Sequence, residues 1–210
     1  MTGIGESHVE EAALAWLADL GYATLHGLSI GPDADRPERT SYGDVVLIGR
    51  LDEALRRLNP HLPPEALSEA KAKVLRVETQ SLVHENRRLH RFLSEGVPVE
   101  VRRADGTIGG EQVRLLDFDE PTANDLLAVN QFTVIENRAN RRPDVVVFIN
   151  GLPLAVLELK HPGKPNATLD GAFNQFQTYK DQIGSLFRAN AVLIITDGIA
   201  ARIGSLTADR

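Results

Sequence analysis

The sequence predicts an α/β fold in which helices cover both faces of a mixed sheet. Apolar residues recur at helical spacing through much of residues 10–93, and from Val97 onward they alternate with the period of two that is typical of strands. A fully apolar run near the end of the chain, residues 191–196, predicts one further buried strand. There is no internal repeat or clear linker. We therefore expect a single domain over residues 1–210, with a mainly helical portion (1–95) and a sheet-containing catalytic core (96–210).

The individual elements follow from the same periodicities and from the residues that end them. The predicted helices are residues 10–20, 47–58, 65 to about 93, and 169 to about 187. The predicted strands are residues 99–102, 113–118, 131–135 and 191–196, together with the two arms of a hairpin within residues 141–160. In the first helix we expect Leu14 and Leu17, with Ala13 and Trp16, to face the core. Residues 29–41, rich in Gly, Pro and charge, predict a loop.

The hairpin within residues 141–160 is the most informative stretch of the sequence. Two apolar runs flank Asn150-Gly151, a dipeptide that tolerates positive φ and strongly favours a hairpin turn. With a loop over residues 149–153, Phe148 is expected to pair with Leu154. The same register places Asp144, which opens the first run, opposite Glu158 in the second. A slip of one residue would reverse the faces of the strand.

Charged residues at the end of this hairpin have two interpretations. Alternation places Glu158 and Lys160 on one face of the strand, so they could form a salt bridge at the margin of a sheet. Alternatively, Asp144 and Glu158 could supply the carboxylate oxygens that Mg²⁺ prefers, and Lys160 could orient or deprotonate a water or stabilise developing charge. Because Glu158 interrupts an apolar run in which a lone charge is costly to bury, we favour the second interpretation, a metal-dependent phosphodiesterase site.

A second cluster lies on the predicted helix after the hairpin. Gln175 and Tyr179 are four residues apart and so share one helix face. They could be a surface glutamine beside a half-buried tyrosine, or their polar groups could point at the carboxylates or at a DNA phosphate. Gln177 and Lys180 could take the same role, and spacing alone does not choose between these readings.

Composition limits the remaining classes of function. The chain of 210 residues has no cysteine, which excludes disulfides and cysteine-based zinc sites and favours a cytoplasmic protein. It has no apolar run of membrane-spanning length, no Walker loop and no Gly-x-Ser-x-Gly motif, and its histidines are too scattered for a zinc motif. The net charge of −6 argues against strong unassisted binding to nucleic acid. Arginines cluster at residues 87–91 and 138–142, and each cluster alone predicts a solvated surface.

With these residues in view, the chain resembles the N-terminal nuclease domain of the restriction (R) subunit of type I restriction-modification enzymes. The specific part of the resemblance is Arg142-Pro143-Asp144, an apolar strand, and then Asn150-Gly151-Leu152-Pro153-Leu154 before Glu158 and Lys160. Further matching segments, in the family's order, are residues 40–47, 58–60, 86–87, 96–97, 130–132, 197–198 and 203–208. The resemblance covers nearly the whole chain.

The resemblance implies a restriction-endonuclease-like PD-(D/E)xK core. It assigns catalytic positions to Asp144, Glu158 and Lys160, with Mg²⁺ held by the two carboxylates and Mn²⁺ expected to substitute. It also carries over a Gln-x-x-x-Tyr motif as Gln175 and Tyr179. A helical glutamate sometimes completes such sites, and Glu85 is the candidate here.

In that family the R subunit continues into helicase-like motor domains that hydrolyse ATP and translocate DNA. None of their motifs is present, so we expect the chain to be part of a longer subunit and ATP to act only through those domains. The implied function is Mg²⁺-dependent cleavage of double-stranded DNA after translocation, in a complex with methylation and specificity subunits and without a membrane. Two alternatives remain: a catalytically silent docking fragment of the same complex, and a stand-alone nuclease of the repair type.

Overall fold

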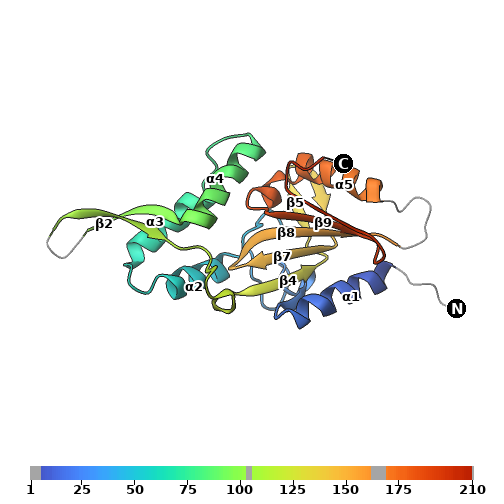
Figure 1. Cartoon of the computed structure of the whole chain (residues 1–210), viewed down its shortest axis with the longest axis horizontal. Coiled ribbons are helices and arrows are strands. Elements are labelled where there is room, and N and C mark those ends of the chain that lie inside the picture. Colours follow the sequence, from blue (N-terminus) through green and yellow to red (C-terminus); the bar gives the residue numbers. More distant parts are fainter. Residues whose placement is uncertain (1–5, 103–105, 162–168, 210) are drawn as a thin grey trace.

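The computed structural model describes residues 6–102, 106–161 and 169–209, and its centre is a six-stranded mixed sheet (Figure 1). The strand order is β1-β4-β7-β8-β9-β10. These strands are β1 (Ala23–His26), β4 (Leu126–Asn130), β7 (Val145–Ile149), β8 (Leu152–Leu159), β9 (Val192–Thr196) and β10 (Ala201–Gly204). β1 pairs with β4 and β8 with β9 in parallel, and the other neighbours are antiparallel.

One helix covers each face of this sheet, as the sequence predicts. Along β7, Val145 and Val147 pack in one cluster with α1 (Glu6–Asp19), whereas Val146 and Phe148 pack in another with α5 (Leu169–Gln182). The alternation of apolar side chains therefore fills both faces of the strand. The α/β class with a central mixed sheet flanked by helices is confirmed.

The remaining helices form a lobe beside the sheet, and the hydrophobic core of this lobe also includes Leu152 and Leu154 of β8. The lobe comprises α2 (Ile48–Leu58), α3 (Pro64–Leu75), α4 (Leu82–Glu95) and the two-stranded sheet of β2 (Val97–Arg102) and β3 (Ile108–Val113), which projects from the molecule (Figure 1). Asn86 on α4 attaches this lobe to the sheet, because its side-chain amide donates to the carbonyls of Phe187 and Asn190 near the short helix η3 (Gly184–Phe187).

Several predicted boundaries are wrong. The helix expected over residues 65 to about 93 is two helices, α3 and α4, because Ser81 caps the start of α4 and the carboxylate of Glu85 accepts hydrogen bonds from the backbone of residues 78 and 79. The strand expected over residues 113–118 lies earlier, as β3, and the one expected over residues 131–135 falls after β4 and overlaps only the start of the next strand. Gln131, with φ of 55°, ends β4, and the chain then forms a small separate sheet of β5 (Val134–Glu136) and β6 (Ala139–Arg141). Strand β1 was not predicted.

Two further details of the sequence reading change. Trp16 is 63% exposed rather than in the core, whereas Ala13 is buried and Leu14 and Leu17 pack against its cluster. The helix expected to end near residue 187 ends at Gln182 and is followed by η3. Within the described ranges, no helix has the length and apolar character needed to cross a membrane.

The turn between β7 and β8 explains the Asn150-Gly151 dipeptide. Both residues have positive φ, 52° and 78°. Asn150 is fully buried, and its side-chain oxygen accepts from the Asp125 backbone and from Arg57, while its amide nitrogen donates to the Leu115 carbonyl and to Asn124. The turn is thus fixed to the lobe and to the start of β4, which leaves the opposite end of the hairpin to carry the charged residues.

Candidate active site

Asp144 and Glu158 lie across from each other at the end of the β7–β8 hairpin. Val145 pairs with Leu157, and this register continues to Asp144 and Glu158, as predicted. The Leu159 backbone N–H donates to Asp144 Oδ2 over 2.7 Å, which fixes that carboxylate against β8. Toward the turn the prediction is wrong, because a register shift after Val147 pairs Phe148 with Pro153 instead of Leu154.

Glu158 is buried on the face of the sheet that α5 covers. Its neighbours Leu157 and Leu159 belong to the cluster under α1, so alternation turns Glu158 to the other side. Only 1% of Glu158 is exposed, and Lys160 Nζ donates to its Oε1 over 2.7 Å. The 160 backbone N–H donates to the Thr196 carbonyl of β9, which holds the lysine at the strand end.

The α5 residues continue this arrangement as a chain of hydrogen bonds. Lys160 Nζ also donates to Gln175 Oε1 over 2.8 Å, and Gln175 Nε2 donates to the Tyr179 hydroxyl oxygen over 2.6 Å. An ammonium group can only donate, so the oxygen of the Gln175 amide must face Lys160 and its nitrogen must face Tyr179. Of the alternatives that spacing left open, the structure brings Gln175 and Tyr179 to Lys160. Lys180 instead donates to the Leu206 carbonyl, and with Gln177 it lines a different hollow.

Tyr179 is 4% exposed and remains protonated at neutral pH. Burial, followed by the negative charge of Glu158, raises the pKa of Tyr179 to about 12, although the hydrogen bond from Gln175 opposes the shift. Asp144 raises it further and Arg141 lowers it. The hydroxyl is therefore a neutral hydrogen-bonding group in the field of both carboxylates.

Glu85 does not join this cluster. Its Oε1 accepts from the backbone N–H groups of residues 78 and 79, and its Oε2 accepts from Arg88 over 2.7 Å. It therefore holds the start of α4 within the helical lobe. Glu85 does lie on a helix, as expected, but its carboxylate forms hydrogen bonds that stabilise the helical lobe.

Sequence reasoning missed a contact at the same end of the sheet. Glu10 on α1 accepts from the side-chain amides of Asn130 over 2.6 Å and Gln131 over 2.7 Å. The Gln131 backbone N–H in turn donates to the Asp144 carbonyl over 2.8 Å. Helix α1 thus supports the backbone of Asp144. The only sequence signal was that residues 130–132 matched the resembled family.

The chemistry of the donor set fits a hard divalent cation held by two carboxylates. Asp144 and Glu158 offer oxygen ligands, and such sites are completed by water and phosphate oxygens for Mg²⁺. Within the part of the chain that the structure describes, no group of three or more His, Cys, Asp or Glu side chains is placed to hold a metal. The fit is to an ion that shares its coordination with substrate, not to a closed structural site.

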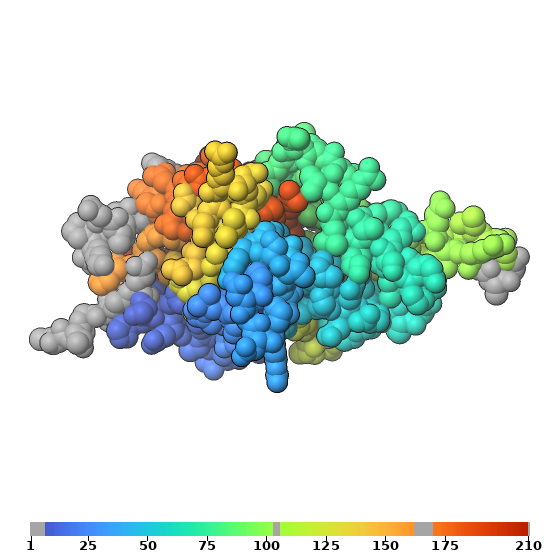
Figure 2. All heavy atoms as spheres, turned by 180° about the vertical axis from the view of Figure 1, so that it is seen from behind, coloured from blue at the N-terminus to red at the C-terminus, as the bar shows by residue number. Residues whose placement is uncertain are grey.

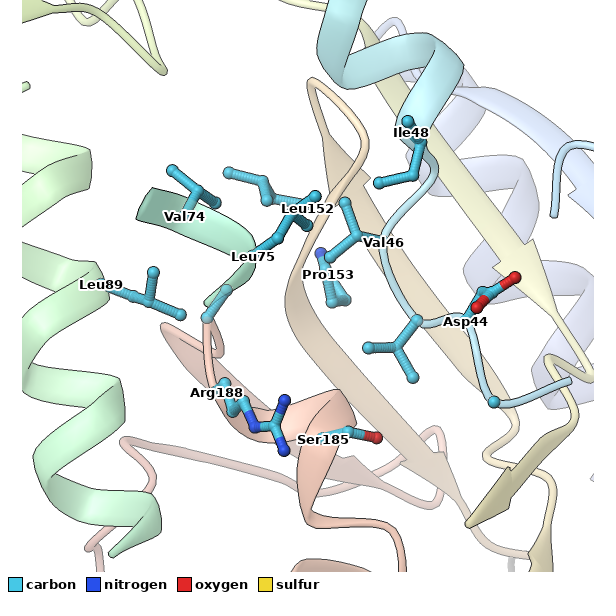
Figure 3. Close-up of a pocket in the computed structure, with 13 residues that line it drawn as sticks. Asp44, Val46, Ile48, Val74, Leu75, Leu89, Leu152, Pro153, Ser185 and Arg188 are labelled. Atoms are coloured by element: carbon cyan, nitrogen blue, oxygen red, sulfur yellow. The ribbon is translucent and has the colours of Figure 1, made fainter. Parts of the chain in front are cut away.

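A mainly apolar hollow lies elsewhere, between the helical lobe and the sheet (Figure 3). It encloses about 300 Å³ and is bordered by Val74, Leu89, Leu152 and Pro153, with Arg188 and Ser185 at one edge. None of the five candidate catalytic residues lines it. The candidate active site is therefore separate from this hollow and consists of largely buried polar groups at the end of β8 and on α5.

Comparison with known proteins gives the family. Residues 4–210 match the family of the type I restriction enzyme R protein N terminus, and the chain belongs to that family. It is 40% identical over 98% of its length to the type I restriction enzyme HindI endonuclease subunit of Haemophilus influenzae. It is also 35% identical over 96% of its length to the putative type I restriction enzyme MjaIXP endonuclease subunit of Methanocaldococcus jannaschii.

These matches cover 20% and 19% of the two relatives, so the chain spans about a fifth of their length. A shorter match, 33% identical over 50% of this chain and 33% of the relative, is to the type I restriction enzyme EcoprrI endonuclease subunit of Escherichia coli. The resemblance predicted from the Asn150-Gly151-Leu152-Pro153-Leu154 stretch is confirmed at the level of the family.

Proposed function

We propose that the chain is a Mg²⁺-dependent nuclease domain with a PD-(D/E)xK core that hydrolyses phosphodiester bonds of double-stranded DNA. The observation that carries the proposal is the position of the Lys160 ammonium, which bonds both Glu158 and Gln175. Asp144 lies opposite Glu158 in the register of the β7–β8 hairpin. Two carboxylates and one lysine at the end of a strand are groups that metal-assisted hydrolysis of a phosphodiester uses.

Each polar residue of the candidate site would have a separate role in the reaction. Lys160 positions the attacking water or stabilises the charge that develops on the phosphate, since its ammonium is held between two acceptors. Gln175 holds Lys160 in that place, and Tyr179 holds Gln175. The buried tyrosine adds no charge to the site, because its pKa lies well above neutral pH.

Asp144 and Glu158 would hold the metal, with the Leu159 carbonyl as a further possible ligand from the same strand. When bound, Mg²⁺ supplies Lewis-acid polarisation of the phosphate and a more acidic water. In the absence of the ion, Lys160 provides the positive charge that a buried Glu158 requires. Mn²⁺ is expected to substitute, since it also prefers carboxylate oxygens.

The larger setting of this activity follows from the family. We propose that the chain serves as the nuclease part of a cytoplasmic type I restriction enzyme, with ATP hydrolysis and DNA translocation supplied by motor domains outside it. Methylation and specificity subunits would be its partners, and the choice of DNA sequence would belong to the specificity subunit. The names of the relatives, which are type I restriction enzyme endonuclease subunits, support this assignment.

Metal titration separates this proposal from a catalytically silent docking role, which the net charge of −6 would suit. Calorimetry with Mg²⁺ and Mn²⁺ should give saturable binding to the wild-type protein and none to Asp144→Asn. Asp52→Asn is the matched control, since Asp52 pairs with Lys71 on the helical lobe. Equal binding by wild type and Asp144→Asn would favour the docking role.

A further inference from the structure

We propose that the β5–β6 hairpin binds the DNA backbone beside the candidate active site, through Arg138 at its turn and Arg142 just after it. This inference rests on the proposed nuclease function and identifies the element that brings the substrate to Asp144. The hairpin is the small separate sheet in which Glu136 pairs with Ala139, so that Asn137 and Arg138 form the turn. Figure 2 shows this segment, in yellow, standing out from the molecular surface.

The location of the hairpin follows from its place in the chain. Arg142 is two residues before Asp144, so their Cα atoms are at most ~7 Å apart. Arg142 and Arg138 are exposed, whereas Pro143 between Arg142 and Asp144 is buried. The exposed Arg142 is therefore close along the backbone to Asp144, which directly precedes β7, and Arg138 lies at the turn of the same hairpin.

Both strands of the hairpin are anchored, so the turn is presented in a fixed position. On β5, Glu136 Oε2 accepts from the Ser185 backbone over 3.0 Å and from its hydroxyl over 2.7 Å. On β6, Arg141 Nε donates to Gln182 Oε1 over 2.6 Å, one turn of α5 beyond Tyr179. Arg141 also lowers the pKa of Tyr179, which places its charge near the candidate site.

The charges of this element are available to a ligand. Among the described residues, no carboxylate forms an ion pair with Arg138, Arg141 or Arg142. Asp181 lines the same open hollow as the hairpin, and the carboxylate of Glu136 is engaged with Ser185. The element therefore keeps a local positive charge within a chain whose net charge is −6.

Arg88, in the other arginine cluster, differs in this respect. Arg88 donates to Glu85 and to the carbonyls of residues 73 and 76, so it holds the helical lobe together. A phosphate that approaches Asp144 and Glu158 meets repulsion from both carboxylates. The positive charges of Arg138 and Arg142 offset that repulsion, and guanidinium groups bind phosphate through directed hydrogen bonds.

The test uses the complete enzyme with the double substitution Arg138→Ala and Arg142→Ala, and measures DNA cleavage as a function of salt. We expect cleavage to fall about tenfold or more at moderate salt, with ATP hydrolysis unchanged. Each lost phosphate contact removes about 0.9 from the slope of log affinity against log salt, so the salt dependence of the cleavage step should weaken by about 2. Lysine at both positions should restore the salt dependence, because an ammonium group also binds phosphate as a point charge.

The matched control is Arg56→Ala, which removes an exposed arginine in the last turn of α2, within the helical lobe; we expect no change. Normal cleavage and salt dependence in the double alanine variant would overturn the inference, as would a loss of cleavage with unchanged salt dependence. The variant Asp144→Asn, measured in parallel, distinguishes a failure of this inference from a failure of the proposed nuclease function. If that variant also cleaves normally, the proposed nuclease site itself is wrong.

Discussion

Lys160 and Gln175 are joined by a hydrogen bond of 2.8 Å that sets the orientation of the glutamine amide. This hydrogen bond connects Lys160, directly after β8, to Gln175 on α5. The same amide bonds Tyr179 with its other end. The candidate site is therefore supported by α5, which packs on one face of the β7–β8 hairpin.

We expect Gln175→Ala to lower DNA cleavage by about 10- to 100-fold, because loss of a supporting hydrogen bond releases Lys160 from its position. Tyr179→Phe should have a smaller effect, since it removes only the group that supports Gln175. Single-turnover cleavage by the complete enzyme measures both. Gln177→Ala, on the same helix and lining a different hollow, is the control. Equal rates for Gln175→Ala and Gln177→Ala would contradict the supporting role.

The raised pKa of Tyr179 predicts a loss of stability at high pH. The folded protein keeps the phenol protonated to a pKa of about 12, whereas the unfolded chain releases the proton near the ordinary value of 10.0. Stability is thus fully present below pH 10 and falls as the pH rises toward 12, by up to ~3 kcal/mol. Denaturant unfolding of wild type and Tyr179→Phe at a series of pH values isolates this effect. A constant difference between the two proteins from pH 9 to 12 would refute it.

Glu85→Gln is expected to lower the stability of the helical lobe by about 1–3 kcal/mol while leaving metal binding unchanged. Burial opposes ionisation of Glu85, but the hydrogen bonds from Arg88 and from the backbone of residues 79 and 78 outweigh it and lower its pKa. The stabilisation is therefore present above pH 4.5, the ordinary value, and is lost as the pH falls through the lowered pKa.

Unfolding curves at neutral and acidic pH check this prediction, and Glu78→Gln is the control because Glu78 is half exposed and 3.9 Å from Arg88. A loss of Mg²⁺ binding in Glu85→Gln, with stability intact, would return Glu85 to the metal site.

Gly151→Ala should destabilise the protein more than Gly106→Ala. Both glycines have positive φ, 78° and 86°, so each substitution costs about 1–2 kcal/mol of backbone strain. A methyl group at Gly151 would lie 2.4 Å from the Leu47 carbonyl oxygen, whereas one at Gly106 would have no atom of the described residues within 4 Å. Crowding should add about 1–3 kcal/mol at Gly151 alone. Equal midpoints of denaturant unfolding for the two variants would show that the turn does not pack against α2 as described.

The sequence allowed the hairpin and the faces of its strands to be predicted, because both follow from local signals. Asn150-Gly151 marks the turn, and the alternation of residues 144–160 decides which side chains share a face. The pairing of Asp144 with Glu158 followed from these two facts. Near the turn the register shift at Phe148 escaped prediction, since a bulge has no distinct residue pattern here.

Other features depend on contacts between distant parts of the chain. The parallel pairing of β1 with β4 joins residues about a hundred positions apart, which periodicity does not reveal. Glu10 reaches Asn130 and Gln131 only after that sheet has formed. Likewise, the choice of Gln175 over Gln177 depends on how α5 packs on the sheet, which spacing along one helix leaves open.

The most direct test of the nuclease site is Mg²⁺-dependent DNA cleavage by the complete enzyme carrying Asp144→Ala, Glu158→Ala or Lys160→Ala, with ATP-driven translocation measured in the same preparations. We predict that each substitution abolishes cleavage and leaves translocation intact, because it removes a metal ligand or the ammonium beside the ligands. Normal cleavage by any one of the three variants would contradict the role proposed for that residue, and normal cleavage by all three would place the nuclease elsewhere.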